Sequence, residues 1–371
     1  MRHAEACRLV GCVSTVTAVR IAISGARRSP AASPDDDVSE MPTEGPLVDR
    51  FGRVHDDLRL SVTDRCNLRC VYCMPAVGMT FLPRAEILSF EEIARVARIG
   101  RALGVRSVRL TGGEPLVRRD IRDLVERIAA LGFDDVALTT NGMLLAPMAQ
   151  GLAAAGLRRV NISCDSLRPE RFSAIRRRGK LDVVLDAMRA AEDAGLAPIK
   201  VNVVLLRGRN DDEILDFAGF ARDTGRVVRF IEYMPLDAEG TWDRARLVPG
   251  HEVVERVSAV WPLEAVQRDD DPAPADRYRF ADGKGEIGVI STVTEPFCGT
   301  CNRLRLTADG AIRNCLFSDD EHPVRDVLRD GGSDDDLALL LRRAVWGKLP
   351  GHGINEPGFL RPRRSMSMIG G

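Results

Sequence analysis

The chain has 371 residues, of which 44% are hydrophobic and 29% are charged, and its formal net charge is -1. This length allows one large domain or two, and the near-neutral charge argues against a protein that binds nucleic acid or an anionic membrane through bulk charge. The nine cysteines are clustered, which favours metal binding in a reducing cytoplasm over a secreted disulfide scaffold.

Residues 1–45 differ in composition from the rest of the chain. A weakly apolar stretch is interrupted by Arg20 and is followed by Ser, Pro, Gly and an acidic run. We therefore expect neither a secretory signal nor a membrane span. We predict a disordered extension, or an overlong start with Met41 as the true initiator, and we do not count Cys7 and Cys12 as ligands.

Residues 46–243 alternate short β-rich runs with amphipathic runs, which is typical of a parallel α/β unit. Ser89 and Glu92 form a capping-box pattern at the start of the first helix. The predicted strands are Leu58–Thr63, Ser107–Thr111, Val136–Thr140, Arg159–Cys164, Ile199–Leu205 and Val227–Tyr233. The predicted helices are Ile93–Leu103, Ile121–Leu131, Met148–Ala155, Leu181–Ala194 and Asp211–Arg222.

Six strand–helix repeats fit either an open doubly wound sheet or an incomplete barrel, and the pattern alone does not separate the two. In both folds the functional residues gather at the carboxyl ends of the strands. This rule selects the segment after Thr63, TGGEP at Thr111, TTN at Thr139, NISCD at Asn161 and the residues from Tyr233.

The sequence changes in character after Asp243, and we predict a smaller C-terminal region over residues 244–371. A Pro- and Asp-rich linker at Asp269–Asp276 precedes two hairpin-like runs, Tyr278–Phe280 and Ile287–Ser291.

The strongest chemical signal is the CxxxCxxC spacing of Cys66, Cys70 and Cys73. Cubane iron–sulfur clusters normally bind four thiolates, so three leave one iron open to a group that is not protein. A zinc site completed from elsewhere and a set of buried thiols are the alternatives. Zinc sites favour CxxC pairs, however, and three cysteines on one short loop are dense for packing alone.

The C-terminal region repeats this pattern with Cys298, Cys301 and Cys315, again without a fourth cysteine nearby. A second cluster with an open iron would be a binding site for a substrate. The remaining Cys164 ends a predicted strand and points away from Ser163 by alternation, so we expect it in the core.

These motifs resemble the radical S-adenosylmethionine superfamily, in which a CxxxCxxC loop with an aromatic residue such as Tyr72 is followed by a GGEP sequence, here Gly112–Pro115. The second cysteine set, RFIEYM ending at Met234 and the terminal Gly370–Gly371 are similar to the GTP 3′,8-cyclase family (molybdenum cofactor biosynthesis protein A). The resemblance covers about residues 48–371. It implies an incomplete (β/α)6 TIM-type barrel whose open side is closed by a smaller C-terminal iron–sulfur region.

The resemblance also implies the chemistry. Two [4Fe–4S] clusters, each with three cysteine ligands and one open iron, would bind S-adenosylmethionine and the guanine of GTP. A 5′-deoxyadenosyl radical would abstract hydrogen from the ribose 3′ carbon, and that carbon would attack guanine carbon 8 to give (8S)-3′,8-cyclo-7,8-dihydroguanosine 5′-triphosphate. An electron donor and a cyclic pyranopterin monophosphate synthase that takes the product are the implied partners.

Residue roles follow from the resemblance in the same way. The resemblance implies that S-adenosylmethionine is contacted by Tyr72, Gly113, Ser163 and Met234. Packing at strand ends is the alternative for Ser163 and Met234. GTP would bind to Arg59, Arg109, Thr139, Lys200, Arg303, Leu304 and Arg305. The catalytic tail residues Gly370 and Gly371 would reach into the barrel. Bare backbone at Gly112 and Gly113 would admit the methionine moiety, whose ammonium would donate to Glu114.

A triphosphate needs local cations because the net charge supplies none. Arg303 and Arg305 alternate after Cys301, so both side chains point the same way, and guanidinium forks suit phosphate oxygens. A solvated surface charge is the alternative for any single arginine. We predict that the basic run Arg176–Lys180 is a surface loop.

Two other functions remain open from the sequence. A radical S-adenosylmethionine enzyme that modifies a peptide would require neither the Arg303–Arg305 run nor the Gly–Gly end. A zinc or iron–sulfur binding module would have no catalytic activity. We predict a cytoplasmic enzyme, a monomer or homodimer, with no nucleic-acid or membrane partner.

Overall fold

The computed structural model describes residues 38–266 and 272–370. The predictions for Cys7, Cys12 and Gly371 lie outside these ranges, as does most of the predicted extension. Its last residues are described, however: the Met41 side chain is buried, and the Gly45 carbonyl accepts a hydrogen bond of 2.7 Å from Arg342. The packed part of the chain therefore begins before residue 46.

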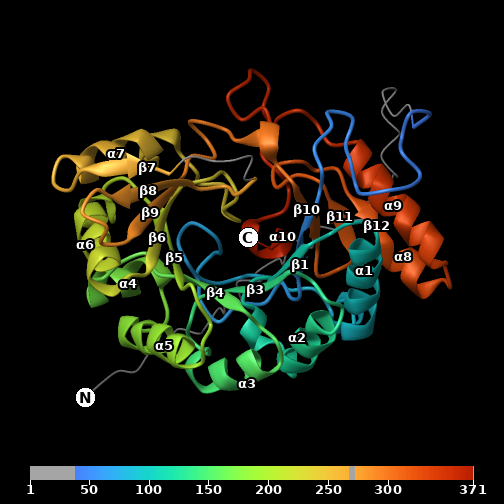
Figure 1. Ribbon diagram of the computed structural model, residues 1–371, viewed down its shortest axis with the longest axis horizontal. Coiled ribbons are helices and arrows are strands. Elements are labelled where there is room, and N and C mark those ends of the chain that lie inside the picture. The colour runs from blue at the N-terminus through green and yellow to red at the C-terminus, as the bar shows by residue number, and fades with distance from the viewer. Residues whose placement is uncertain (1–37, 267–271, 371) are drawn as a thin grey trace, which may run out of the picture. The chain divides into compact units, whose positions relative to one another are not determined.

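Six parallel strands lie side by side in chain order, which confirms the predicted βα repeats (Figure 1). They are β1 (Asp57–Ser61), β2 (Ser107–Thr111), β3 (Asp135–Thr140), β4 (Arg159–Ser163), β5 (Lys200–Leu205) and β6 (Val227–Glu232). Each predicted strand matches one of these to within two residues at either end.

The helices that follow these strands cover the outer face of the sheet (Figure 1). They are α1 (Phe90–Ala102), α2 (Ile121–Ala129), α3 (Ala149–Ala154), α4 (Pro169–Arg176), α5 (Leu181–Asp193) and α6 (Ile214–Thr224). Both hydrogen bonds of the predicted capping box at Ser89 and Glu92 are present, so α1 begins where the sequence predicts. The helix α4 was not predicted, because the segment shows little amphipathic periodicity.

The sheet is extended at both edges by strands of the C-terminal region and does not close on itself. At one edge β10 (Arg303–Leu306) pairs in parallel with β1 and is followed by β11 (Ala311–Arg313) and β12 (His322–Pro323). At the other edge β9 (Glu286–Ile290) pairs in parallel with β6, followed by β8 (Asp276–Phe280) and β7 (Leu263–Ala265). The predicted incomplete barrel and the predicted hairpin of β8 and β9 are confirmed.

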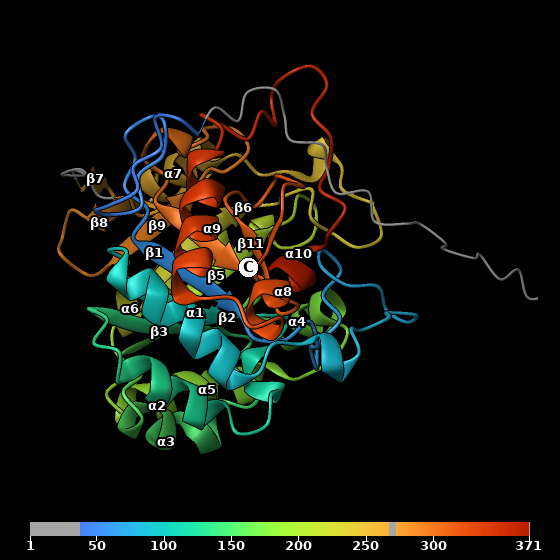
Figure 2. The same cartoon turned by 90° about the vertical axis from the view of Figure 1, so that its right-hand side faces the viewer.

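The remaining helices are α7 (Gly250–Ser258), α8 (Val324–Arg329), α9 (Asp334–Trp346) and the short C-terminal α10 (Met366–Ile369). Single 3-10 turns occur at Arg84–Glu86, Pro115–Val117, Ala146–Met148, Asp211–Glu213, Arg244–Arg246 and Cys298–Thr300. Figures 1 and 2 place α10 within the arc of the strands, so the tail ends inside the barrel. In the described ranges no helix combines the length and apolar character that crossing a membrane requires.

Alternation along the strands separates the core from the barrel interior. On β1, Leu58 and Leu60 are buried in the hydrophobic core, whereas Arg59 lines the interior cavity. Cys164 also lies fully buried in the core, as predicted. The sheet therefore presents its polar side chains to one enclosed space.

Candidate functional site

One cavity inside the arc of strands brings the two cysteine triads together. Its wall includes Cys66, Cys70 and Cys73 from the loop after β1, and Cys298, Cys301 and Cys315 from the C-terminal region. All six are free thiols. Two sets of potential ligands that lie more than 200 residues apart in sequence thus face the same space.

Most of the predicted site residues line this cavity. Besides the six cysteines they are Arg59, Tyr72, Arg109, Gly113, Thr139, Ser163, Met234, Arg303 and Arg305. Lys200, Leu304 and Gly370 do not line it. Alternation on β10 turns the Leu304 side chain into the hydrophobic core, so a contact between this residue and a substrate would use its backbone.

The N-terminal triad lies on a tightly turned loop. The backbone amides of Cys73 and Met74 both donate to the Cys70 carbonyl, at 3.0 and 3.1 Å, and the Leu68 amide donates to Cys66 Sγ at 3.4 Å. Burial raises the pKa of the Cys66 thiol to about 11 and also raises the pKa values of Cys70 and Cys73. A bound cation such as iron would favour the thiolate forms that burial disfavours.

The two glycines of the GGEP sequence line the cavity and also pack closely against the protein itself. A Cβ atom on Gly112 would lie 2.5 Å from the Thr63 carbonyl oxygen, and one on Gly113 would lie 2.4 Å from that of Arg65. The Gly113 amide instead donates to Thr63 O at 2.7 Å. Within the protein, these glycines are needed because the GGEP segment packs directly against the backbone of the cysteine loop.

Glu114 is held by the protein itself. Its two carboxylate oxygens accept hydrogen bonds from Thr140 Oγ1 at 2.8 Å, from the Asn141 amide at 2.7 Å and from the Leu116 amide at 3.0 Å. Burial raises the pKa of Glu114 to about 7, against the opposite effect of these hydrogen bonds. The carboxylate therefore ties the ends of β2 and β3 together beside the triad.

A buried group that the sequence did not predict supports Cys70. Arg176, expected on a surface loop, ends α4 and is 2% exposed; it donates to Cys70 Sγ at 3.6 Å and pairs with Asp165 at 2.8 Å. The same carboxylate accepts a hydrogen bond of 2.8 Å from the Tyr72 hydroxyl. The surface-loop prediction is wrong for Arg176 because Asp165 compensates its charge in the interior.

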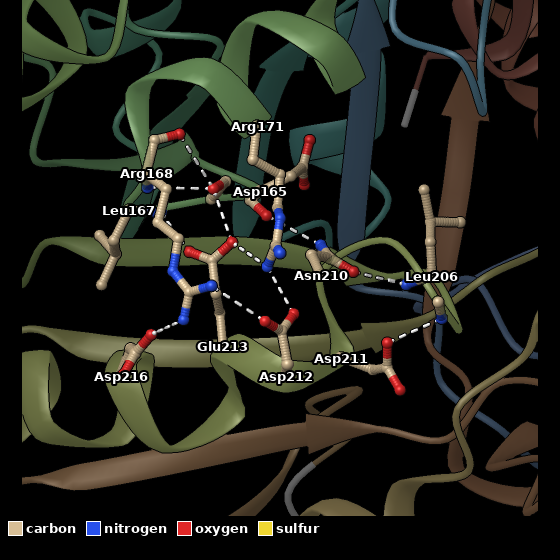
Figure 3. A network of polar contacts seen from close by, with 12 residues as sticks. Asp165, Leu167, Arg168, Arg171, Leu206, Asn210, Asp211, Asp212, Glu213 and Asp216 are labelled. Atoms are coloured by element: carbon tan, nitrogen blue, oxygen red, sulfur yellow. Dashed lines mark hydrogen bonds and ion pairs between the residues drawn. The ribbon is translucent and has the colours of Figure 1, made fainter.

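A second layer of polar contacts fixes the loop that carries Asp165 (Figure 3). Asn210 donates to the Asp165 carbonyl at 2.8 Å, and the buried Glu213 accepts from the Ser166 hydroxyl and from the Leu167 amide, both at 2.7 Å. In the same view Arg168, just before α4, donates to Asp212, and Arg171 of α4 donates to Glu213. Both acceptors lie in the 3-10 turn that precedes α6. The position of Asp165 is thus set by the β5–α6 connection.

The C-terminal triad is supported by residues from distant parts of the chain. Lys348 Nζ donates to Cys301 Sγ at 3.2 Å, and Arg53 Nη1 donates to the Cys298 carbonyl at 2.8 Å. Burial alone would raise the pKa of Cys301, but the charges of Arg303 and Lys348 lower it to about 6. The Cys301 thiol therefore ionises more readily than the thiols of the N-terminal triad, whose pKa values are raised.

A row of arginines crosses the cavity floor. Arg305 on β10, Arg59 on β1 and Arg109 on β2 are direct neighbours in the sheet register. Like charges placed opposite each other destabilise a sheet, and the counter-charge here is Asp57, 3.7 Å from Arg59. The buried Nε atoms of Arg59 and Arg109 have no hydrogen-bond partner in the described ranges. Asp57 is one counter-charge to three guanidinium groups, so the row carries an excess of positive charge.

Further cations lie beside this row. Arg229 on β6 lines the cavity, donates from Nε to Asn202 Oδ1 at 2.9 Å, and has a pKa that burial lowers to about 9. Burial and the neighbouring arginines also lower the pKa of Lys200 to about 8. The sequence analysis missed Arg229, although an arginine within the apolar strand sequence VVRFIE is a detectable signal.

The C-terminal tail reaches this row. The Gly370 carbonyl accepts a hydrogen bond of 2.7 Å from Arg305 Nη1. With φ of +87°, a Cβ atom on Gly370 would lie 2.6 Å from Thr111 Oγ1 and 2.8 Å from Ser61 Cβ. Only glycine fits this position without displacing β1 and β2.

The donor chemistry suits clusters better than single ions. Among the described residues, no three His, Cys, Asp or Glu side chains are close enough together to bind one metal ion. In a cubane each thiolate binds a different iron, so a triad need not converge on one point. The two cysteine triads that face a shared cavity fit this arrangement.

Comparisons with known proteins agree with this site. Residues 60–221 match the family model of the radical SAM superfamily, and residues 226–354 match that of Molybdenum Cofactor Synthesis C. The chain is 47% identical to GTP 3′,8-cyclase of Corynebacterium glutamicum over 94% of its own length and 96% of that protein. It is 45% identical to GTP 3′,8-cyclase of Streptomyces coelicolor over 88% and 96%, respectively.

Solved structures support the fold. The chain is similar to anSMEcpe with bound AdoMet at a TM-score of 0.53 and 15% identity, covering 80% of this chain and 82% of that one. It is similar to Streptococcus suis SuiB bound to S-adenosylmethionine at a TM-score of 0.53 and 15% identity, covering 73% of this chain and 60% of that one. With its two family models and its extensive identity to curated relatives, the chain belongs to the GTP 3′,8-cyclase family of radical S-adenosylmethionine enzymes.

Proposed function

We propose that the chain converts GTP into (8S)-3′,8-cyclo-7,8-dihydroguanosine 5′-triphosphate, the first step of molybdenum cofactor biosynthesis, in the cavity between the two triads. The observation that carries this proposal is the row of guanidinium donors of Arg305, Arg59 and Arg109, neighbouring residues in the sheet that all line the cavity. Phosphate oxygens would satisfy these donors and offset the repulsion between the guanidinium groups.

The first triad would hold a [4Fe–4S] cluster through Cys66, Cys70 and Cys73, and the second triad would hold another through Cys298, Cys301 and Cys315. When bound, the N-terminal cluster and S-adenosylmethionine supply a 5′-deoxyadenosyl radical, and the second cluster offers an open iron to the guanine base.

The protein's own residues would bind and orient the reactants. The arginine row would fix the triphosphate, with Lys200, Arg229 and Arg303 as further cations and Thr139 as a hydrogen-bond donor. Gly113, Ser163 and Met234 would line the S-adenosylmethionine site, where Asp165 holds the Tyr72 hydroxyl. The Gly370 carbonyl would hold Arg305 in place, and we propose that Gly371 is also needed for catalysis.

Competition binding tests the nucleotide assignment. Anaerobically reconstituted protein with radiolabelled GTP in equilibrium dialysis should release the label to unlabelled GTP at far lower concentration than to ATP or GMP. The comparison of GTP with ATP tests recognition of the guanine base, and the comparison of GTP with GMP tests recognition of the triphosphate. Equal competition by ATP or GMP would contradict the corresponding half of the proposal.

The physiological setting follows from this chemistry. We propose a cytoplasmic enzyme that takes electrons from a separate donor protein and passes its product to a cyclic pyranopterin monophosphate synthase. Reducing conditions would keep all six cluster cysteines out of disulfides and available as ligands.

A further inference from the structure

Each triad has one buried cation that donates a hydrogen bond to one of its sulfurs. Arg176 donates to Cys70 Sγ at 3.6 Å, and Lys348 donates to Cys301 Sγ at 3.2 Å. Both cations are nearly inaccessible to solvent, at 2% and 3% exposure, so their charges are weakly screened. Both contacts are hydrogen bonds from a cation to a cysteine sulfur, but the charges around the two cations differ.

The charge of Arg176 is compensated. Asp165 lies 2.8 Å from its guanidinium and is itself fully buried. The same carboxylate accepts hydrogen bonds from the Tyr72 hydroxyl and from the Val204 amide, at 2.8 and 3.0 Å, which hold it in place. Two further buried groups of opposite charge lie beside this triad, Arg69, which donates to the Cys66 carbonyl at 2.7 Å, and Glu114. The charges around the N-terminal triad are therefore nearly balanced.

The charge of Lys348 is not compensated in this way. Besides Cys301 Sγ, its Nζ contacts in the described part of the chain are the carbonyl oxygens of Arg303 at 3.1 Å and of Cys301 at 3.4 Å. Neither acceptor carries a formal charge. The guanidinium of Arg303, which lies over the Phe297 ring at 4.9 Å, adds a second positive charge on this side of the cavity. The C-terminal triad thus faces a net positive environment.

Reduction of a cluster adds one negative charge, which nearby cations and hydrogen bonds to the ligand sulfurs stabilise. We propose that Lys348 is a positioning residue that orients Cys301 and raises the reduction potential of the second cluster above that of the N-terminal cluster. This inference rests on the proposed function, because it requires a cluster at each triad.

The experiment measures each cluster in the full-length chain by itself. Replacing Cys298, Cys301 and Cys315 together with Ala isolates the N-terminal cluster, whose midpoint potential should be more negative than that of the second cluster. Replacing Cys66, Cys70 and Cys73 together with Ala isolates the second cluster, whose midpoint potential is measured by a dye-mediated titration followed by electron paramagnetic resonance. In this background, Lys348→Met removes the positive charge and keeps a side chain of similar length. This substitution should shift the midpoint potential of the second cluster to more negative values. Lys348→Arg should leave it close to that of the parent, and so should Lys284→Met, a control at an exposed turn.

The outcomes separate the inference from the function on which it rests. Absence of iron in the isolated background would overturn both the second cluster and the inference. Iron with an unchanged potential in Lys348→Met would overturn the inference alone. If the Lys348→Met variant binds no iron, the potential is measured in Lys348→Gln, which removes the charge but keeps a hydrogen-bond donor. Loss of iron in Lys348→Gln as well would show that Lys348 has a structural role and would overturn its role in tuning the potential.

Discussion

The two triads face one cavity, yet they are built in opposite ways. The N-terminal triad lies within eight consecutive residues, and its loop is packed against the adjacent GGEP segment and the ion pair of Asp165 and Arg176. The C-terminal triad spans Cys298 to Cys315 and depends on Lys348 and on Arg53 from distant segments. Both triads depend on residues from distant segments, but the first lies beside balanced charge and the second beside excess positive charge. A site for a polyanionic nucleotide belongs on the second side.

The largest effect should follow from removing the C-terminal triad. Replacing Cys298, Cys301 and Cys315 with Ala should remove about four of about eight irons per chain. Because the N-terminal triad is independent of these residues, cleavage of S-adenosylmethionine should persist while the GTP-derived product falls below detection. Iron analysis and chromatography of both products check this. Formation of the cyclic nucleotide by this variant would contradict the separate roles proposed for the two triads.

The next effect concerns the arginine row. Arg109→Met removes a buried guanidinium whose loss should cost GTP binding about 1.5–3 kcal/mol, or about ten- to a hundredfold in the dissociation constant. Since it also removes like-charge repulsion, the free energy of unfolding without GTP should not fall. The matched control is Arg158→Met, at an exposed position. A loss of stability with unchanged GTP affinity would mark Arg109 as structural.

The tail gives a smaller effect. Gly370→Ala places a methyl group 2.6 Å from Thr111 Oγ1 at φ of +87°, so the tail should withdraw from Arg305. We expect turnover to fall about tenfold, corresponding to about 1.4 kcal/mol, with iron content unchanged. Gly358→Ala is the control, because Gly358 has φ of +92° but open space around it. Wild-type turnover in Gly370→Ala would show that turnover does not depend on the position of the tail.

The smallest effect is a dependence on pH. Lys200 has a pKa lowered to about 8 by burial and by its arginine neighbours, so it is charged below that pH and neutral above it. If it assists triphosphate binding, the dissociation constant of GTP should rise about threefold between about pH 7 and pH 9. In Lys200→Arg this rise should disappear, because arginine stays protonated. The same rise in both proteins would assign the titration to another group.

The local parts of this site could be predicted from the sequence and the long-range parts could not. Strand positions, the capping box at Ser89 and the burial of Cys164 follow from short-range periodicity, which a sequence displays directly. The interior position of Arg176 depends on Asp165, and the role of Lys348 depends on the path of the chain after α9. Neither partner is adjacent in sequence. The same limit applies to the packing of Gly112 and Gly113 against the cysteine loop, which the sequence does not reveal.

The central claim is that both triads act on one nucleotide in one cavity. Anaerobic incubation of reconstituted full-length protein with GTP, S-adenosylmethionine and a strong reductant tests it most directly. We predict that 5′-deoxyadenosine and the 3′,8-cyclic nucleotide form in equal amounts. Formation of 5′-deoxyadenosine without any GTP-derived cyclic product would contradict the claim.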